Sequence, residues 1–279
     1  MISHVAARFL KAVHLEAMIL PISEIVWKAA PTYYYKHRWS TLRNSYRERE
    51  LYVAPFLCNP NKISIDVGAS EGLYTLHVLQ TSRECLAFEP HPTAALKLSG
   101  MAKSFSLPVR VEAVALSEKE GEETLRIYKG GIKRSTIERE NDLADCDSRN
   151  MYEVTVPTRQ LDDYDLDAVG FLKIDVEGHE LSVLKGASNT IEHHRPLMLI
   201  EIEDRHKPKA TRDVQDFLGN LGYEGYFLLD GKLIPMTCFA LDAYQGNCTS
   251  GYYVNNFFFV MPEDIHILES AVFRVRENL

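Results

Sequence analysis

The chain has 279 residues, of which 46% are hydrophobic and 25% are charged, and its formal net charge is −8. This composition is typical of a globular protein, and the acidic balance argues against a general nucleic-acid binder, whose surface would be basic. No uninterrupted apolar segment approaches the roughly 20 residues that a membrane-spanning helix needs. The five cysteines form no CxxC pair, so we expect neither a zinc site nor a disulfide framework, and a reducing, cytoplasmic location.

The first part of the chain is predicted to be helical. Apolar side chains recur at helical spacing over residues 5–19, 22–29 and about 46–57. Pro21 separates the first two of these segments, and an aromatic and basic stretch, TYYYKHRW, occupies 32–39. We therefore expect an N-terminal helical extension over residues 1–45, followed by one larger domain over residues 46–279.

In the larger domain, short apolar runs alternate with helical segments. Strands are expected at 62–67, 84–89, 109–116, 123–129, 152–158, 171–176, 196–203, 223–230 and 255–261. Helices are expected at 72–80, 92–103, 179–186 and 211–221. Strands that are separated by helices of this length predict βαβ units, and hence an α/β fold with a doubly wound, mostly parallel sheet.

The strongest local signal is the turn in SIDVGASEGLYT, residues 64–75, where an apolar strand runs into two glycines and a helix. In an open α/β sheet, ligands bind beyond the carboxyl ends of the strands, and glycines there allow a close approach of the backbone. The second strand ends at Glu89, where an acidic residue is placed to accept hydrogen bonds from ribose hydroxyl groups. The sequence therefore predicts a nucleoside-containing ligand, with a turn that binds no ligand as the alternative.

Two details of this turn favour S-adenosylmethionine (SAM) over NAD. The glycines are spaced GxxxG, so the GxGxxG pattern that binds a pyrophosphate is missing. Asp66, at the strand end two residues before the first glycine, would be unfavourable beside a pyrophosphate but suits an ammonium or sulfonium group. An NAD-linked oxidoreductase remains the less favoured alternative.

Several blocks of the sequence, taken together, resemble the FkbM family of SAM-dependent methyltransferases, which mostly methylate hydroxyl groups of sugars and other natural products. The resembling blocks occur in the family's order over about residues 46–262: IDVGASEGLYT (65–75), FEPHP (88–92), VALSEKEG (114–121), LDDY (161–164), FLKIDVEGHELSVLKGA (171–187), PLMLIEIE (196–203) and NFFFV (256–260). The resemblance implies the Rossmann-like fold of class I SAM-methyltransferases, with one antiparallel strand near the C-terminus.

The resemblance also implies which residues bind the cofactor and the acceptor. The residues expected around the amino-acid portion of SAM are Asp66, Gly68, Ser70, Gly72 and Thr75. Glu89 is expected to hold the ribose, and Val114 and Ala115 to border the adenine. The family often has Asn where Ser70 stands here, and both side chains form hydrogen bonds. Ser135 and Thr136 resemble a hydroxyl pair of the family and are expected to face the acceptor.

The stretch FLKIDVEGHE, residues 171–180, supplies the first catalytic candidates, since it places polar groups after an apolar strand. Asp175 is expected close to the methyl group or the acceptor. His179 titrates near neutral pH and is a candidate general base, with a hydrogen bond to helix backbone as the alternative role. Glu177 remains undecided, and Glu180 is expected to stabilise the first turn of the following helix.

Glu201 and Glu203 are the other catalytic candidates. They alternate with apolar residues and are therefore expected on one face of their strand. Together with Asp175 they would form an oxygen-ligand set for Mg²⁺, which makes metal-assisted transfer an alternative mechanism. His206, in the stretch RHKPK, is expected to be a solvated loop residue.

The sequence thus predicts a SAM-dependent O-methyltransferase that acts on a hydroxyl group of a small molecule or glycan, in polysaccharide or natural-product biosynthesis. The alternatives are a metal-assisted form of this reaction, a catalytically inactive SAM-binding protein and, less favoured, an NAD-linked oxidoreductase. The stretch 32–39 is expected to pack on the surface, with a cover over the acceptor site or a contact in a homodimer as alternatives.

Overall fold

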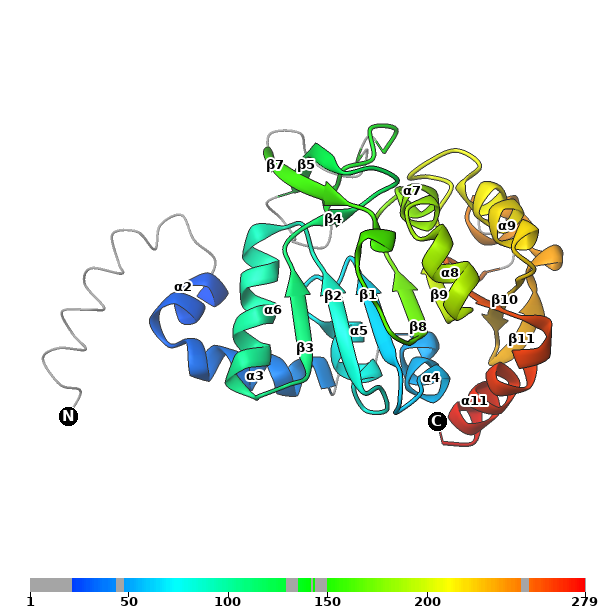
Figure 1. Ribbon diagram of the computed structural model, residues 1–279, viewed down its shortest axis with the longest axis horizontal. Coiled ribbons are helices and arrows are strands. Elements are labelled where there is room, and N and C mark those ends of the chain that lie inside the picture. The colour runs from blue at the N-terminus through cyan, green and yellow to red at the C-terminus, as the bar shows by residue number, and fades with distance from the viewer. Residues whose placement is uncertain are drawn as a thin grey trace, which may run out of the picture.

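The computed structural model describes residues 22–43, 48–128, 135–141, 143, 150–246 and 251–278. The helix predicted at 5–19 lies outside these ranges. The strands of the main sheet are β1 (Ile63–Val67), β2 (Glu84–Phe88), β3 (Val109–Glu112), β8 (Val169–Ile174), β9 (Leu197–Glu201), β10 (Glu224–Leu229), β11 (Lys232–Pro235) and β12 (Asn256–Val260). Their order across the sheet is β11-β10-β12-β9-β8-β1-β2-β3 (Figure 1).

The directions of these strands confirm the predicted fold class. β3, β2, β1, β8 and β9 pair in parallel, whereas β12 runs antiparallel between β9 and β10. The short strand β11 pairs antiparallel with β10 and is an addition to the predicted set. The chain therefore has a mostly parallel, doubly wound sheet with antiparallel pairing near its C-terminal end.

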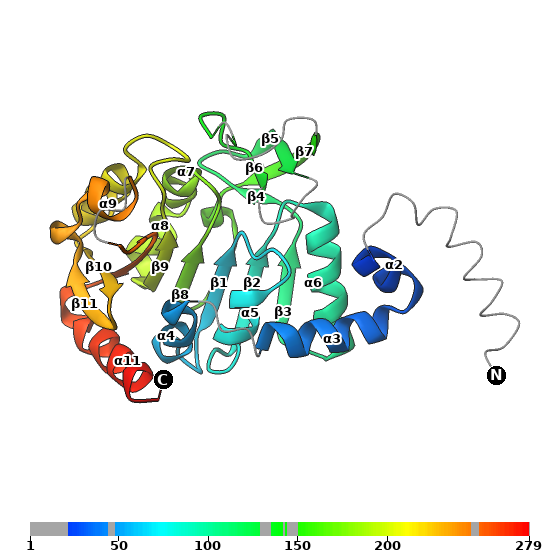
Figure 2. The ribbon, with the colours of Figure 1, turned by 180° about the vertical axis from the view of Figure 1, so that it is seen from behind.

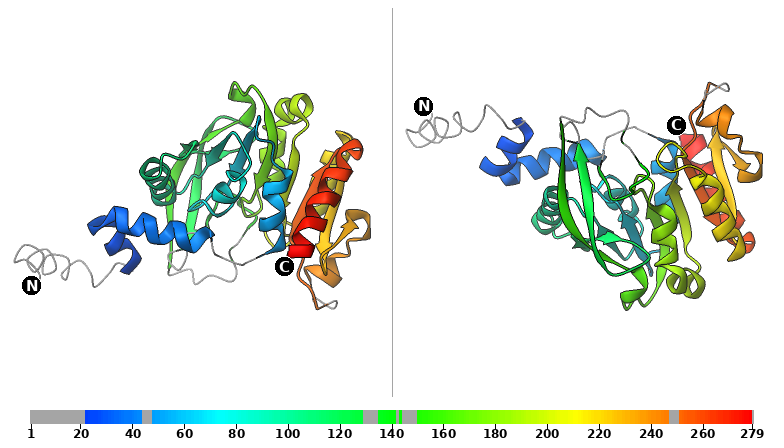
Figure 3. Two further views of the ribbon diagram at one scale, coloured as in Figure 1. Left: turned by 90° about the horizontal axis from the view of Figure 1, so that it is seen from below. Right: turned by 90° about the horizontal axis from the view of Figure 1, so that it is seen from above.

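The helices lie on both faces of this sheet, as the two edge-on views of Figure 3 show. They are α2 (Ile22–Ala29), α3 (Pro31–Arg43), α4 (Arg49–Leu57), α5 (Leu73–Val78), α6 (Pro92–Ser104), α7 (Glu180–Lys185), α8 (Ser188–His194), α9 (Ala210–Asn220), α10 (Leu241–Tyr244) and α11 (Ile265–Asn278). Short 3₁₀ helices occupy Leu161–Asp163, Met236–Cys238 and Pro262–Asp264. The predicted helices of the larger domain correspond to α4, α5, α6, α7 and α9, whereas α8, α10 and α11 are additions.

Side chains of the central strands alternate between the two helical layers, as the two-residue period of a strand requires. In β8, Phe171 belongs to the core that α4 and α11 cover, and Leu172 to the core that α7, α8 and α9 cover. Leu199 and Ile200 of β9 divide in the same way. Because both faces are buried, these strands read as continuous apolar runs, and a polar side chain within them is exceptional.

The strand predicted at 109–116 is in fact two strands, because the chain leaves the main sheet after Glu112. β4 (Ala115–Leu116) joins a second sheet, of order β4-β7-β5-β6, with β5 (Gly121–Tyr128), β6 (Ser135–Thr136) and β7 (Met151–Arg159). β3 is an edge strand, and Ala115 pairs instead with Thr158 and is buried in the apolar core of the small sheet. Figure 1 shows this sheet above the arrowheads of β1 and β2, and thus at the carboxyl edge of the main sheet.

The N-terminal helices lie against the larger domain. α2 matches the helix predicted at 22–29, and the stretch 32–39 forms the middle of α3, which contacts α5 and α6 (Figure 2). None of the helices in the described part of the chain is both long and apolar enough to cross a bilayer. The domain boundary at residue 45 remains a prediction.

Candidate active site

A cavity of about 280 Å³ lies where β1, β2, β8 and β9 end, and the small sheet contributes to its wall. Most of the predicted site residues line it: Asp66, Gly68, Ser70, Glu89, Val114, Ala115, Ser135, Thr136, Asp175, Glu177, His179 and Glu201. Gly72, Thr75 and Glu203 are not among the lining residues. The structure therefore brings together residues that are more than 130 positions apart in the chain.

Gly68 brings the first turn directly against the end of β8. Its φ is +79°, and a Cβ built on it would lie 1.8 Å from the carbonyl oxygen of Asp175. The backbone N–H groups of Gly68 and Ala69 both donate to the carbonyl oxygen of Phe88 at the end of β2. Only a glycine permits this conformation and this approach, so Gly68 fixes the relative position of three strand ends.

Glu89 bridges the first two loops of the site. Its carboxylate accepts hydrogen bonds from the backbone N–H groups of Ser70, at 2.6 Å, and of His91, at 2.7 Å. Burial raises the pKa of Glu89 to about 7, although both hydrogen bonds oppose this shift. The carboxyl group is thus held rigidly at the position where the sequence predicts a ribose contact.

Asp66, near the end of β1, is the second buried carboxyl group of the site. Thr75 donates a hydrogen bond to it at 2.5 Å, and burial raises its pKa to about 6. Thr75 is fully buried and therefore supports Asp66 from behind the cavity wall. Gly72 also has a supporting position, because a Cβ built on it would lie 2.5 Å from Leu98 of α6.

Three further carboxyl groups, those of Asp175, Glu177 and Glu201, form an acidic wall at the ends of β8 and β9. Burial, followed by the negative charge of Asp175, raises the pKa of Glu177 to about 8 and that of Glu201 to about 9. Glu177 and Glu201 therefore retain protons at neutral pH. A protonated carboxyl group both donates and accepts hydrogen bonds.

Lys173 is a cavity residue that the sequence prediction missed. It is 1% exposed and lies one residue before the end of β8. Its Nζ donates to the carbonyl oxygen of Ile174 at 3.1 Å and lies 4.9 Å from the ring centre of Tyr74. Its positive charge opposes the rise in the pKa of Asp66 and Glu201. The sequence did contain an indication of this residue, namely a lysine within an otherwise apolar strand. A buried ammonium group needs partners of opposite charge, so such a lysine indicates nearby carboxyl groups.

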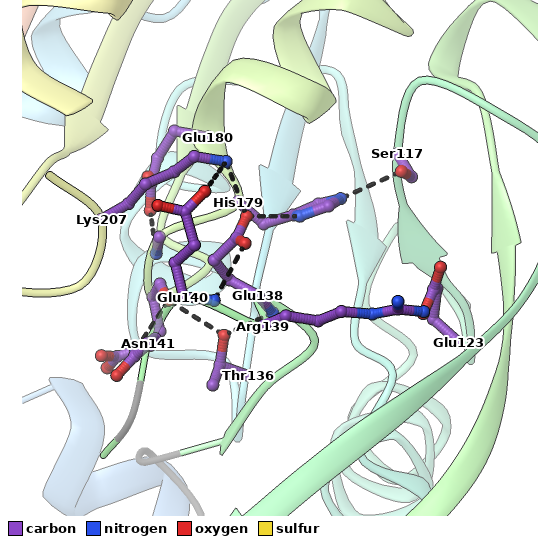
Figure 4. Close-up of polar contacts among 12 residues, drawn as sticks. Ser117, Glu123, Thr136, Glu138, Arg139, Glu140, Asn141, His179, Glu180 and Lys207 are labelled. Carbon is purple, nitrogen blue, oxygen red and sulfur yellow. Dashed lines mark hydrogen bonds and ion pairs between the residues drawn. The ribbon is translucent and has the colours of Figure 1, made fainter. Parts of the chain in front are cut away.

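His179 is held at both ring nitrogens (Figure 4). Its Nε2 lies 2.9 Å from the hydroxyl oxygen of Ser117, and its Nδ1 lies 3.3 Å from a carboxylate oxygen of Glu138. Lys207 also contacts Glu138, at 3.0 Å, and the hydrogen bond from His179 is the largest cause that lowers the pKa of Glu138 to about 2. The side chain of His179 forms no helix-capping hydrogen bond, so the alternative role expected from the sequence is not the one observed.

Glu177 is fixed in an unusual backbone conformation. Its φ is +56°, and its carbonyl oxygen accepts hydrogen bonds from Thr136 and from Asn141, each at 2.9 Å. A carboxyl oxygen of Glu177 lies 3.0 Å from Nε2 of His206. His206 is 6% exposed, so the expectation of a solvated loop residue was wrong. Glu180 is buried and accepts a hydrogen bond from the N–H of Gly178, so it stabilises the turn before α7.

The carboxylate of Glu203 contacts protein side chains and is not placed to bind the predicted metal ion. Its carboxylate contacts Arg205, at 2.5 Å, and the hydroxyl group of Tyr253, while Asn255 donates to both Glu201 and Glu203. Hydrogen bonds from Arg205 and Tyr253 lower the pKa of Glu203, although burial alone would raise it. In the ranges that the structure describes, no three His, Cys, Asp or Glu side chains are grouped to hold a metal ion. Asp175, Glu201 and Glu203 therefore do not assemble into the predicted Mg²⁺ ligand set.

The N-terminal segments contribute directly to the cavity. Arg38 and Leu42 of α3, together with Glu48, line it. Arg38 forms an ion pair with Glu71, a residue of the first turn. The expectation that the stretch 32–39 only packs on the surface was therefore wrong, since one of its side chains faces the site.

A family model described as the methyltransferase FkbM domain matches residues 66–224, more than half of the chain. No curated protein matches the chain in sequence.

Three solved structures are similar to the chain at low sequence identity. A methyltransferase FkbM from Methylobacillus flagellatus is 18% identical, with 72% of this chain and 44% of that chain covered and a TM-score of 0.47. An rRNA methylase from Streptococcus thermophilus is 12% identical over 77% and 96% of the two chains, with a TM-score of 0.41. A SAM-dependent O-methyltransferase from Thermotoga maritima is 10% identical over 78% and 66%, with a TM-score of 0.38. The chain thus spans less than half the length of the first of these proteins.

Proposed function

The chain belongs to the FkbM family of SAM-dependent methyltransferases, and on this premise we propose that it transfers the methyl group of SAM to a hydroxyl group of a small molecule or glycan. The observation that carries the proposal is the position of two acidic residues in one cavity. Glu89, fixed by two backbone N–H groups, and Asp175, at the end of β8, both line it. We assign Glu89 to the ribose and Asp175 to the reacting end of the cofactor.

The lining residues of the cavity fit SAM in chemical type. The buried carboxyl groups of Asp66 and Glu89 suit the donors of SAM, namely its ammonium group and its ribose hydroxyl groups. Val114, Ala115 and Leu125 supply an apolar end that suits adenine. SAM itself brings an electrophilic methyl group on a positively charged sulfur, so the protein needs no covalent nucleophile.

Transfer to a neutral hydroxyl group requires a residue that accepts its proton. We assign this role to Asp175, because its carboxyl group lines the cavity at the end of β8, where the reacting end of the cofactor is proposed to lie. His179 is the second candidate, but its Nε2 is engaged by Ser117, which does not line the cavity. We therefore assign His179 a positioning role between β4 and the loop that carries Glu138.

The acidic wall also suits a polyhydroxylated acceptor. The protonated carboxyl groups of Glu177 and Glu201 are able to donate and accept hydrogen bonds, as the hydroxyl groups of a sugar do. Thr136 already donates to the carbonyl oxygen of Glu177 and accepts from the N–H of Glu138. The acceptor contacts of Ser135 and Thr136, the homodimer and the cytoplasmic location remain predictions from the sequence.

Binding and turnover experiments test the proposal. Isothermal titration is expected to give micromolar binding of S-adenosylhomocysteine (SAH) and no binding of NADH. A screen of hydroxylated acceptors with methyl-labelled SAM is expected to give a labelled methyl ether. Binding of SAH without transfer to any acceptor would favour an inactive SAM-binding protein, and binding of NADH alone would favour the oxidoreductase.

A further inference from the structure

We propose that Arg38 of α3 binds the carboxylate group of SAM, so that the N-terminal extension completes the cofactor site. This inference rests on the proposed function, and it concerns a residue that lies outside the family match at residues 66–224. Arg38 lines the same cavity as Ser70 and Glu89.

One donor of the Arg38 guanidinium group lacks an acceptor in the part of the chain that the structure describes. Its Nη2 pairs with a carboxylate oxygen of Glu71. Its Nε is buried and has no hydrogen-bond partner among the residues that the structure describes. A buried donor without an acceptor is unfavourable, so an acceptor group from a ligand would complete this arrangement. A carboxylate is suited to this position, because guanidinium groups bind carboxylates through two N–H groups.

The charges of the cavity point to the same group of SAM. SAM carries two positive centres, its sulfonium and its ammonium, and one negative centre, its carboxylate. The acidic lining residues suit the two positive centres. In the described part of the lining, the lysine and arginine side chains are those of Lys173 and Arg38.

Of these two cations, Lys173 already contacts groups of the protein itself. It is 1% exposed, it donates to the carbonyl oxygen of Ile174, and it lies over the ring of Tyr74. The side chain of Arg38 is 26% exposed and lies beside the first turn. Arg38 is therefore the cation that is accessible to the carboxylate.

Arg38 is also held in place before any ligand binds. Its partner Glu71 accepts hydrogen bonds from Tyr34, at 3.0 Å, and from Lys97, at 3.2 Å. Lys97 is 4% exposed and also pairs with Glu24 of α2. Lys97 of α6 therefore contacts α2 directly, through Glu24, and α3 indirectly, through Glu71. Such preorganisation lowers the entropic cost of binding.

The docking of α3 on α6 depends on close packing as well. A Cβ built on Gly100 would lie 2.1 Å from the hydroxyl oxygen of Tyr35, so the ring of Tyr35 fits against a bare backbone. The same hydroxyl group accepts a hydrogen bond from Trp27 at 2.9 Å. These contacts place α3 at a defined distance from the first turn, and with it the side chain of Arg38.

The decisive experiment compares two ligands that differ only in the carboxylate. Titration calorimetry measures the Kd of SAM and of decarboxylated SAM for the full chain, for Arg38→Met and for the control Lys36→Met. Lys36 is an exposed cation on the same helix. We expect Arg38→Met to weaken the binding of SAM by roughly 10- to 100-fold and that of decarboxylated SAM by less than about 3-fold. Lys36→Met is expected to leave both values unchanged.

Two outcomes of this comparison would overturn the inference. One is an equal loss for both ligands, which would give Arg38 a structural role only, and the other is no loss for either. If circular dichroism shows that Arg38→Met does not fold, the wild-type protein alone still tests the inference. Equal affinity of the wild-type protein for SAM and for decarboxylated SAM would contradict a contact with the carboxylate. Absence of SAM and SAH binding by the wild-type protein would overturn the proposed function itself, whereas tight SAM binding without selectivity would overturn the role of Arg38 alone.

Discussion

The hydroxyl oxygen of Ser117 lies 2.9 Å from Nε2 of His179, on the ring edge opposite the contact between Nδ1 and Glu138. When the ring is neutral and Nδ1–H donates to the carboxylate, Nε2 carries the lone pair and accepts the hydrogen bond from Ser117. The basic nitrogen of His179 therefore points at a side chain that is 8% exposed and lies outside the cavity lining. This contact is the basis for assigning His179 a positioning role in place of the general-base role for which the sequence makes it a candidate.

Substitution of Asp175 and of His179 distinguishes these roles. We expect Asp175→Asn to lower kcat by roughly 10²- to 10⁴-fold, because it removes the proposed proton acceptor. His179→Gln is expected to lower kcat by less than about 10-fold, because it removes only a positioning contact. The measurement is kcat at saturating SAM, with the Kd of SAH as the control for cofactor binding. A loss for His179→Gln as large as that for Asp175→Asn would return the general-base role to His179.

The raised pKa of Glu201 predicts a pH-dependent stability. A carboxyl group with a folded-state pKa of about 9 favours the folded state while it is protonated, and this contribution is lost as the pH rises from the usual glutamate pKa through about 9. Glu201→Gln keeps an acceptor for Asn255 and cannot ionise. We therefore expect the variant to gain roughly 2–4 °C in Tm over the wild-type protein at pH 9 and less at pH 6. An equal difference in Tm at the two pH values would contradict the assigned burial of this charge.

Gly68 and Gly219 form a matched pair for backbone substitution. Gly68→Ala places a methyl group against the carbonyl oxygen of Asp175 at a positive φ, so we expect lost stability and at least 10-fold weaker SAH binding. Gly219→Ala, inside α9 with no atom within 4 Å of the new Cβ, is expected to stabilise the protein by about 0.5–1 kcal/mol. Urea denaturation and titration with SAH measure both effects. Unchanged SAH binding by Gly68→Ala would show that this turn is not part of the cofactor site.

Local sequence patterns were sufficient to predict the first turn and the strand ends. Asp66, Gly68 and Glu89 follow apolar runs, and the rule that parallel strands end at one edge places them together. The same rule brings Asp175 and Glu201 to this edge. The fold class and most of the cavity lining therefore follow from periodicity, from turn residues and from the family resemblance.

Features that depend on distant pairing escaped the sequence prediction. The split of 109–116 into β3 and β4 depends on β7, where Ala115 pairs with Thr158. The contact between His179 and Glu138 spans 41 positions, and neither residue's neighbours indicate it. The role of Arg38 depends on the docking of α3, which no local pattern specifies. Such contacts are set by tertiary packing, so a single sequence carries no period or spacing that reports them.

The central claim is that the cavity at the carboxyl ends of β1 and β2 binds SAM, with Glu89 holding the ribose. Titration of SAH into the wild-type protein, Glu89→Gln and the control Glu84→Gln tests it most directly, since Glu84 is half-exposed at the opposite end of the same strand. We predict micromolar binding by the wild-type protein and by Glu84→Gln, and at least 10-fold weaker binding by Glu89→Gln. Equal affinity of all three proteins for SAH, or no binding by the wild-type protein, would contradict the claim.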